Sequence, residues 1–344
     1  MRYLRQAAIM RALELSQPGL VTEPRLKWVT RAEPAETGNE ATRSVLLKVR
    51  ACGVCHTDLH IVEGDLPLHR QPIIPGHQVV ATIAAVAPGE NRLQTGQRVG
   101  VPWLFSACGV CEFCRRGAEN LCAQAQFTGW DVDGGYAEYL VARSDFVVPI
   151  PDMFADVAAA PLLCAGVIGY RSLRMAEVQP GERVGLVGFG ASAHLAIQVA
   201  RHWQCEVAVM TRSAEHRRLA EELGAAWTGT AEQAPPWPLD RAVIFAPVGG
   251  LVPTVLGRLR PGGTLAINAI HMSPLPEMNY NLLYGERTLR SVANATRRDA
   301  VEFMQLAAEA RISVEAEVFP LQRGNEALLK LKRGEIRGAA VLVA

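Results

Sequence analysis

The chain has 344 residues, of which 49% are hydrophobic and 20% charged, and its formal net charge is +1. This length suits two domains of ordinary size, and the composition is that of a folded globular protein. The balanced charge offers neither a basic surface for nucleic acid nor an acidic tail, and Arg5 and Arg11 interrupt the N-terminal apolar stretch before it could form a signal peptide or a membrane span. We therefore expect a cytoplasmic protein that binds neither nucleic acid nor membranes.

Residues 1 to about 150 are predicted to be mostly β-structure. Short apolar and β-branched runs, such as SVLLKVRACGV (44–54) and FVVPIP (146–151), are bounded by Gly and Pro. Such runs are typical of short strands. Their repetition favours a barrel-like first domain.

Four cysteines in this part are closely spaced: Cys108, Cys111, Cys114 and Cys122. Four thiolates at this spacing can close the tetrahedral shell of one zinc ion, which is typical of a structural site. The eight cysteines of the chain could instead form four disulfides in an exported protein. That arrangement belongs to short secreted chains without a full-sized core, so we favour zinc.

Three other metal-ligand residues stand far apart in the sequence: Cys55 in ACGVCHTDLH, His77 in IIPGHQ and Cys164 in LLCAG. Two thiolates and one imidazole would leave a fourth zinc position open to water or substrate, as in a catalytic site. Spacing alone does not show that they meet. Cys52 and Cys205 fit no ligand pattern, and we expect them to be small buried side chains.

A helical connection over 151–173 leads to a second part in which strands alternate with amphipathic helices. The candidate strands are RVGLVGF (183–189), EVAVMT (206–211), RAVIFAP (241–247), GTLAINAI (263–270) and RSVAN (290–294). The segments between them are long enough for crossover helices, which predicts a doubly wound parallel sheet of the Rossmann type.

Boundary signals mark one helix of this part, and a last set of elements follows it. Ser213 is a candidate N-cap, and Gly224 is a candidate stop signal after AEHRRLAEEL. The remaining sequence predicts a helix over 298–310, a strand over 314–320, a helix over 325–334 and a strand over 339–344. We expect these last elements to complete the first domain.

The first strand of the second part runs into a glycine turn with candidate cofactor-binding residues Gly188, Gly190 and Ala191. Gly188 permits the tight turn, and Gly190 lets the backbone approach a pyrophosphate at the helix N-terminus. Ala193 is small enough for close helix–strand packing. The alternative is an ordinary strand-to-helix turn, but the whole βαβ context favours a dinucleotide.

The end of the second strand bears on the choice of dinucleotide. An NAD site usually has a carboxylate there for the ribose 2′-hydroxyl, whereas this chain has Thr211, Arg212 and Ser213, with Arg217 one helical turn later. Hydroxyls and guanidinium groups suit a 2′-phosphate. We therefore expect a preference for NADP, with NAD bound without an acidic partner as the alternative.

Together these motifs resemble the zinc-dependent alcohol dehydrogenases of the medium-chain dehydrogenase/reductase superfamily. The likeness runs from GVCHTD through PGH, CGVCEFC, GGYAEY, LLCAG and GFGASAHLA to IRGAAVL. It implies an α/β protein with a β-rich, GroES-like catalytic domain of residues 1–152, completed by 297–344, and a dinucleotide-binding Rossmann domain of residues 153–296. It also implies reversible hydride transfer between an alcohol and a nicotinamide cofactor, in a homodimer or homotetramer.

The resemblance assigns roles residue by residue. It implies two zinc ions per subunit, one catalytic ion on Cys55, His77 and Cys164 and one structural ion on the four closely spaced cysteines. It implies a proton relay through Thr57 and His60, with Asp58 orienting His77. It further implies that His56 and Arg337 contact the cofactor pyrophosphate.

Gln78 departs from the family pattern, which usually has glutamate after the zinc-binding histidine. A neutral amide removes a negative charge near the metal, and we expect bound alcohol to ionise at lower pH and ligands to exchange more slowly. Aromatic residues Trp103, Phe127 and Trp130 lie near the zinc motifs and favour an apolar alcohol, although such residues can also be plain core.

Two alternatives to a general alcohol dehydrogenase are considered. One is a zinc-dependent aldehyde reductase, or a polyol or formaldehyde dehydrogenase, that uses the same machinery. The other is a non-catalytic nucleotide-binding protein that has kept the fold. The second predicts loss of a catalytic ligand or of the relay, and in this sequence both are present.

Overall fold

The computed structural model describes residues 8–34 and 43–344. Arg5 therefore lies outside the described residues. The chain forms two compact units: the first comprises residues 1–164, 296–304 and 314–344, and the second comprises residues 165–295 and 305–313.

These limits differ from the expected boundaries at two places. Helix α3 (Asp156–Pro161) packs on strands of the first unit, so the first limit falls after residue 164 instead of 152. Helix α8 (Arg297–Glu309) begins in the first unit and ends in the second.

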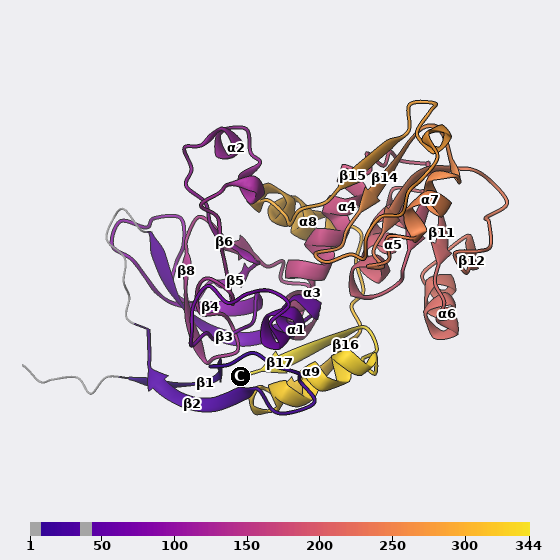
Figure 1. The fold of residues 1–344 in the computed structure, drawn as a ribbon. Coiled ribbons are helices and arrows are strands. Elements are labelled where there is room, and N and C mark those ends of the chain that lie inside the picture. Colours follow the sequence, from indigo (N-terminus) through magenta and orange to yellow (C-terminus); the bar gives the residue numbers. More distant parts are fainter. Residues whose placement is uncertain (1–7, 35–42) are drawn as a thin grey trace, which may run out of the picture. The chain divides into compact units, whose positions relative to one another are not determined.

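A seven-stranded sheet forms the centre of the first unit (Figure 1). The long strand β3 (Ser44–Val54) has β4 on one edge and, on the other, β8 at its start and β17 at its end, all antiparallel. Because β17 comes from the C-terminal end of the chain, the last part completes the first unit as predicted. The other strands are β4 (Gln78–Val86), β5 (Arg98–Val101), β8 (Tyr139–Arg143), β9 (Val148–Pro149), β16 (Ala316–Pro320) and β17 (Ala339–Val343).

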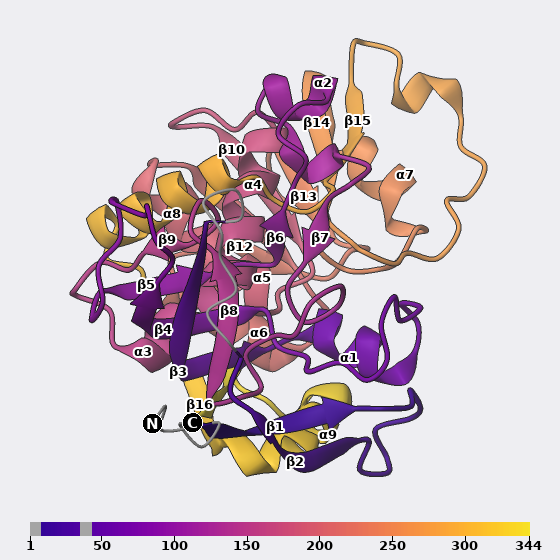
Figure 2. The same cartoon turned by 90° about the vertical axis from the view of Figure 1, so that its left-hand side faces the viewer.

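Smaller elements surround this sheet. Figure 2 shows the antiparallel pair of β1 and β2 lying beside α9. A second small pair, β6 with β7, follows β5 in the chain. These elements are β1 (Ile9–Leu15), β2 (Leu26–Ala32), β6 (Leu104–Ser106), β7 (Gln126–Phe127), α1 (His56–Glu63), α2 (Glu112–Arg115), the 3₁₀ turns Glu119–Leu121 and Leu321–Arg323, and α9 (Gly324–Arg333).

The core of the first unit is apolar and includes side chains from both ends of the chain, such as Leu13, Leu47, Ile83 and Leu342. Along β3 only Lys48 and Arg50 are exposed. A strand that is buried at nearly every position is held between other elements on both faces. The metal-ligand segments described below therefore start from a rigid scaffold.

The second unit is built on a six-stranded parallel sheet in the order β12-β11-β10-β13-β14-β15. This order is that of a doubly wound dinucleotide-binding sheet, with the switch point between β10 and β13. The short strand β12 was not predicted. The strands are β10 (Arg183–Val187), β11 (Glu206–Met210), β12 (Trp227–Gly229), β13 (Leu239–Ile244), β14 (Leu259–Ile267) and β15 (Thr288–Ser291).

Helices connect the strands of this sheet, and one of them confirms its predicted boundaries. The Ser213 side chain accepts a hydrogen bond from the His216 amide at 3.2 Å, and Gly224 ends the helix with φ of 91°. None of the helices in the described part of the chain has the length and apolar character needed to cross a membrane. The helices are α4 (Val167–Met175), α5 (Ala191–His202), α6 (Ala214–Glu222), α7 (Leu251–Leu256) and a 3₁₀ turn (Tyr280–Leu282).

Candidate metal and cofactor sites

The structure brings Cys55, His77 and Cys164 together in the first unit. Cys55 follows β3 as the N-cap of α1, His77 precedes β4, and Cys164 lies in a π-helical turn over Leu162–Gly166. Their ligand atoms all lie within 4.8 Å of one another, and Cys55 Sγ is 3.4 Å from His77 Nε2. A π-helical turn is rare and is found mostly at functional sites.

A buried carboxylate, Asp58, organises this cluster. Its Oδ1 accepts from His77 Nδ1 at 3.0 Å and from the Gly76 amide at 3.2 Å, and its Oδ2 accepts from the Cys55 amide at 2.9 Å. Asp58 and His77 are both fully buried. The bond to Nδ1 leaves His77 Nε2 directed at Cys55, so Asp58 holds two of the three ligands in place.

The close contacts among Cys55, His77 and Cys164 shift the pKa values of all three side chains. The hydrogen bond from Cys164, followed by the charge of His77, lowers the pKa of the Cys55 thiol well below its usual value. Burial alone would lower the pKa of His77, but the charges of Asp58 and Cys55 outweigh it and raise that pKa well above its usual value. The bond to Cys55 and burial raise the pKa of Cys164 well above its usual value. The site therefore stabilises thiolate character at Cys55 in particular.

The donor set of this cluster fits a zinc ion. Tetrahedral zinc with Zn–S of about 2.3 Å and Zn–N of about 2.1 Å requires a sulfur–nitrogen distance of roughly 3.6 Å. The 3.4 Å between Cys55 Sγ and His77 Nε2 is close to that value. Three protein ligands also leave one position of a tetrahedral shell for a small molecule.

The four closely spaced cysteines form a second cluster, whose sulfur atoms all lie within 4.8 Å of one another. Cys114 Sγ is 3.5 Å from Cys111 Sγ and 3.8 Å from Cys108 Sγ. Tetrahedral zinc–thiolate geometry requires sulfur–sulfur distances of roughly 3.8 Å. All eight cysteines of the chain are free thiols, so the disulfide alternative is wrong. The cluster fits a closed Cys₄ zinc site.

Backbone amides favour the thiolate form of Cys108 in this second cluster. Hydrogen bonds from the amides of Val110 and Cys111 lower the pKa of Cys108 to about 6. Partial desolvation and then the contact with Cys111 raise the pKa of Cys114 to about 12. The bond from Cys111 N to Cys108 Sγ is 3.4 Å long, and Gln124 N donates in the same way to Cys122 Sγ at 3.3 Å.

The expected relay residues both lie on α1, which Cys55 caps. Thr57 donates its amide to Cys55 Sγ at 3.4 Å, and its side chain is partly exposed. His60 follows three residues later, so both side chains lie on one face of the helix. His60 Nδ1 lies 2.8 Å from Asp65 Oδ2, a pair that the sequence did not predict. His56 is exposed at the first position of α1.

Gln78, the expected departure from the family pattern, is buried at the start of β4. Its Nε2 has no hydrogen-bond partner among the described residues. A Cβ at Gly53 would lie 2.8 Å from Gln78 Oε1, so the side chain fills the space that this glycine leaves. Gln78 is therefore confined beside the cluster.

The three aromatic residues that were expected near the metal motifs form a continuous cluster next to His77. The Trp103 ring centroid lies 5.8 Å from that of His77 and 4.7 Å from that of Phe127, and Phe127 lies 5.9 Å from Trp130. All three side chains are partly exposed. Trp103, Phe127 and Trp130 are called the aromatic wall below.

In the second unit, the glycine turn lies at the switch point of the parallel sheet. Gly188 has φ of 87°, and a Cβ there would lie 2.8 Å from the Ala246 amide nitrogen, so only glycine fits. Gly190 caps α5 without a side-chain bond, and a Cβ there would meet nothing within 4 Å. The helix that begins at Ala191 therefore presents free amides in open space, which suits a phosphate.

The residues that are expected to discriminate NADP from NAD lie together at the end of β11. Arg212 is exposed, whereas the Arg217 guanidinium donates to the carbonyls of Thr211 at 2.7 Å and Arg212 at 3.0 Å. Arg217 therefore shapes the loop. Hydrogen bonds from the Thr230 side chain and from its own backbone amide, followed by the charges of Arg258 and Arg212, lower the pKa of Glu232. Arg337, expected at the pyrophosphate, pairs with Glu315 at 2.8 Å in the first unit.

Comparison with known proteins adds independent information. The family model of the alcohol dehydrogenase GroES-like domain matches residues 41–152, and that of the zinc-binding dehydrogenase matches residues 193–309. A probable alcohol dehydrogenase, AdhA, of Mycobacterium tuberculosis (strain CDC 1551 / Oshkosh) is 48% identical over 98% of each chain. An alcohol dehydrogenase of Geobacillus stearothermophilus is 38% identical, over 87% of this chain and 91% of its own.

A solved structure gives the same result for the fold. The cobalt- and zinc-bound thermostable alcohol dehydrogenase from Pyrobaculum aerophilum superposes with a TM-score of 0.86 at 26% identity, over 98% of this chain and 100% of its own.

Proposed function

Because the chain belongs to the zinc-dependent alcohol dehydrogenases of the medium-chain dehydrogenase/reductase superfamily, we propose that Cys55, His77 and Cys164 hold its catalytic zinc and that its preferred cofactor is NADP. The enzyme transfers hydride reversibly between an alcohol and a nicotinamide cofactor. The convergence of three ligand atoms within 4.8 Å carries the first part of this proposal. The Cys₄ cluster holds a second, structural zinc ion.

Residues of the first unit have separate roles at the catalytic centre: some hold the zinc ion, one orients a ligand, and two transfer the proton. A zinc ion bound there would supply Lewis-acid chemistry, which lowers the pKa of an alcohol hydroxyl and polarises a carbonyl. Asp58 holds His77 in the tautomer that presents Nε2. The Thr57 hydroxyl would accept the hydroxyl proton of the substrate as it passes its own proton outward, and His60, on the same face of α1 and partly exposed, would release a proton to solvent.

The residues of the second unit bind the dinucleotide. The amides at the start of α5 and the turn at Gly188 and Gly190 receive the pyrophosphate. His56 and Arg337 are further candidates for this group, and Arg337 would have to exchange its pair with Glu315. Arg212 is the candidate for the ribose 2′-phosphate, with hydroxyls from Thr211 and Ser213 beside it.

The exposed guanidinium of Arg212 supports the choice of NADP, and its removal tests that choice. In Arg212→Ala, we expect kcat/KM with NADP to fall roughly 10- to 100-fold, because a charge-assisted hydrogen bond to phosphate is lost. With NAD it should change less than about twofold, since NAD has no 2′-phosphate. Steady-state assays with a panel of primary and secondary alcohols measure both. Arg218→Ala removes an exposed arginine of α6, the helix that follows this loop, and is the matched control.

An NAD enzyme would give a different result in the same assays. The wild type would then use NAD at least as well as NADP, and Arg212→Ala would affect both cofactors alike. The same alcohol and aldehyde panel separates a general alcohol dehydrogenase from an aldehyde reductase or a polyol or formaldehyde dehydrogenase.

We also propose a cytoplasmic homodimer or homotetramer. Eight free thiols suit a reducing compartment. β15 is the edge strand of the parallel sheet, and Tyr280 and Tyr284 are about 70% exposed in the segment before it. Unpaired strand edges and exposed aromatic residues are common at interfaces between subunits. Light scattering measures the native mass.

A further inference from the structure

Two loops of the first unit are joined through His69 and Asp131, which are 62 residues apart in sequence. His69 Nδ1 lies 2.6 Å from Asp131 Oδ1, and the His69 ring lies 4.1 Å from the ring of Trp130 at an interplanar angle of 30°. Trp130 Nε1 donates to the Pro67 carbonyl at 3.0 Å. The Trp130 indole is therefore fixed to the segment 67–69 both by its edge and by its face.

Asp131 also fixes the neighbouring member of the aromatic wall. Its Oδ2 accepts from the Phe127 amide at 2.8 Å, and its own amide donates to the Phe127 carbonyl at 2.9 Å. Its side chain is only 14% exposed, whereas that of His69 is 52% exposed. One nearly buried carboxylate thus holds Phe127 directly and Trp130 through His69. His69 and Asp131 are called the clasp below.

The aromatic wall leads from the clasp to the metal ligands. Trp103, its inner member, lies next to His77, while Trp130, its outer member, carries His69. The Trp103 carbonyl accepts from the Thr128 amide at 2.8 Å, which ties the inner residue to the loop of Phe127. The wall is therefore held at both ends, and no member is fully buried.

Fixed and partly exposed aromatic rings discriminate between ligands by shape. A flat conjugated group can lie parallel or edge-on to such rings at close distance, whereas a puckered saturated group of similar size cannot. The discrimination depends on the ring positions, because a mobile ring would adapt to either group.

We propose that the clasp of His69 and Asp131 fixes Trp130 as a specificity-determining residue, so that the aromatic wall selects alcohols and aldehydes with a flat unsaturated group next to the reacting carbon. Trp130 is the residue that contacts this group, and His69 and Asp131 are positioning residues. This inference rests on the proposed function, since it assumes that the reacting carbon lies at the zinc ion beside His77.

A purely structural role for the same residues makes a different prediction. Trp130 also packs against the core of the first unit. If packing were its whole contribution, its loss would weaken turnover of every substrate by the same factor. The test therefore compares two substrates of nearly equal size, benzyl alcohol with its flat ring and cyclohexylmethanol with its puckered ring.

The experiment measures kcat and KM for both alcohols in the zinc-loaded wild type, Trp130→Leu, Trp130→Phe and His69→Ala. His202→Ala, an exposed histidine on α5, is the matched control. The wild type should prefer benzyl alcohol in kcat/KM. In Trp130→Leu and His69→Ala this preference should fall roughly three- to tenfold, through a higher KM for benzyl alcohol with kcat changed less than about twofold. Trp130→Phe retains a flat ring and should keep most of the preference.

Two results would overturn the inference: no preference in the wild type, or a parallel loss for both alcohols in Trp130→Leu. A second measurement distinguishes failure of this inference from failure of the proposed function: the binding of benzamide and cyclohexanecarboxamide to the same proteins, measured by calorimetry. If the wild type oxidised no alcohol, the proposed function would be wrong. In that case, the role of the clasp would still be supported if the wild type bound benzamide more tightly than cyclohexanecarboxamide and His69→Ala did not. It would be refuted if the wild type bound the two amides equally.

Discussion

Asp58 is a buried side chain that sets the geometry of the candidate metal centre. It bonds to His77, to the Gly76 amide and to the Cys55 amide, so two ligand segments depend on it. Asp58→Asn keeps the size of the side chain but removes its charge. We expect zinc affinity at this centre to fall about 10- to 100-fold.

Competition with a chelator measures this affinity. Asp65→Asn, which alters an exposed carboxylate of the same region, should retain wild-type affinity at the centre. Equal zinc retention in Asp58→Asn and wild type would show that the carboxylate is not needed to orient His77.

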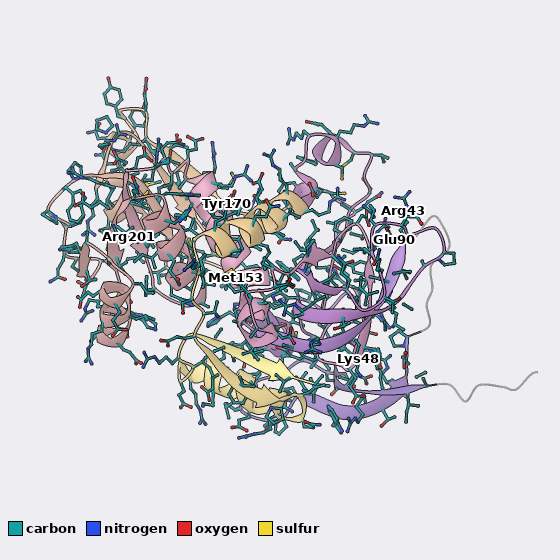
Figure 3. All side chains as sticks on the ribbon, turned by 180° about the vertical axis from the view of Figure 1, so that it is seen from behind. Arg43, Lys48, Glu90, Met153, Tyr170 and Arg201 are labelled. Atoms are coloured by element: carbon teal, nitrogen blue, oxygen red, sulfur yellow. The ribbon has the colours of Figure 1, made fainter. Side chains whose placement is uncertain are left out.

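Glu90 gives a pH dependence that is independent of the metal centres. Figure 3 shows it near Arg43, after β4. Its side chain is 2% exposed, and hydrogen bonds from the Arg92 side chain chiefly lower its pKa to about 2. Since this pKa lies below that of an unfolded glutamate, about 4.3, the ionised form stabilises the fold above that pH and loses this effect as the pH falls toward 2.

Glu90→Gln should therefore lower the free energy of unfolding by about 1 kcal/mol at pH 7, a value reduced by the solvent exposure of Arg92. Urea unfolding at steps from pH 7 to pH 3 should show this difference shrinking in the acid range. Glu222→Gln, at an exposed position on α6, should show no such trend. A difference that stayed constant with pH would contradict the assignment.

Among the elements, we expect the lobe between β6 and β7 to depend on a bound zinc ion more than on packing. Helix α2 within it has no buried residue, so the four cysteines are its main internal connection. Cys111→Ser should release one zinc ion per chain and lower the free energy of unfolding by several kcal/mol, on the order expected for loss of a structural metal.

Metal analysis together with thermal unfolding checks this result. Cys205→Ala serves as the control, because Cys205 is buried outside both clusters and should lose no zinc. Full zinc content in Cys111→Ser would contradict a closed Cys₄ site.

Elements with strong local signals were predictable, and elements defined by distant contacts were not. Ser213 and Gly224 mark α6 in the sequence, and alternating strands and helices gave the parallel sheet correctly. β12 has only three residues, too few for a pattern. The π-helical turn at Cys164 has an ordinary helical sequence, and the pairing of His69 with Asp131 spans 62 residues without any spacing rule.

At the scale of the whole molecule, chain order and spatial order differ. The C-terminal strand β17 pairs with β3, and the ligands Cys55, His77 and Cys164 come from three separate segments of the first unit. The motifs offer these three residues as candidate ligands and the family resemblance implies the same set, but only the fold brings their ligand atoms within reach of one ion. We therefore expect metal binding at this cluster to be coupled to folding of the first unit.

The most direct test of the account combines zinc content with alcohol turnover in Cys164→Ala. Alanine suits the helical turn at this position, so the variant should fold. We expect one zinc ion per chain instead of two, and turnover at least about a thousandfold lower, because the Lewis acid is lost. Two retained zinc ions, or turnover close to that of the wild type, would show that Cys55, His77 and Cys164 do not form the catalytic centre.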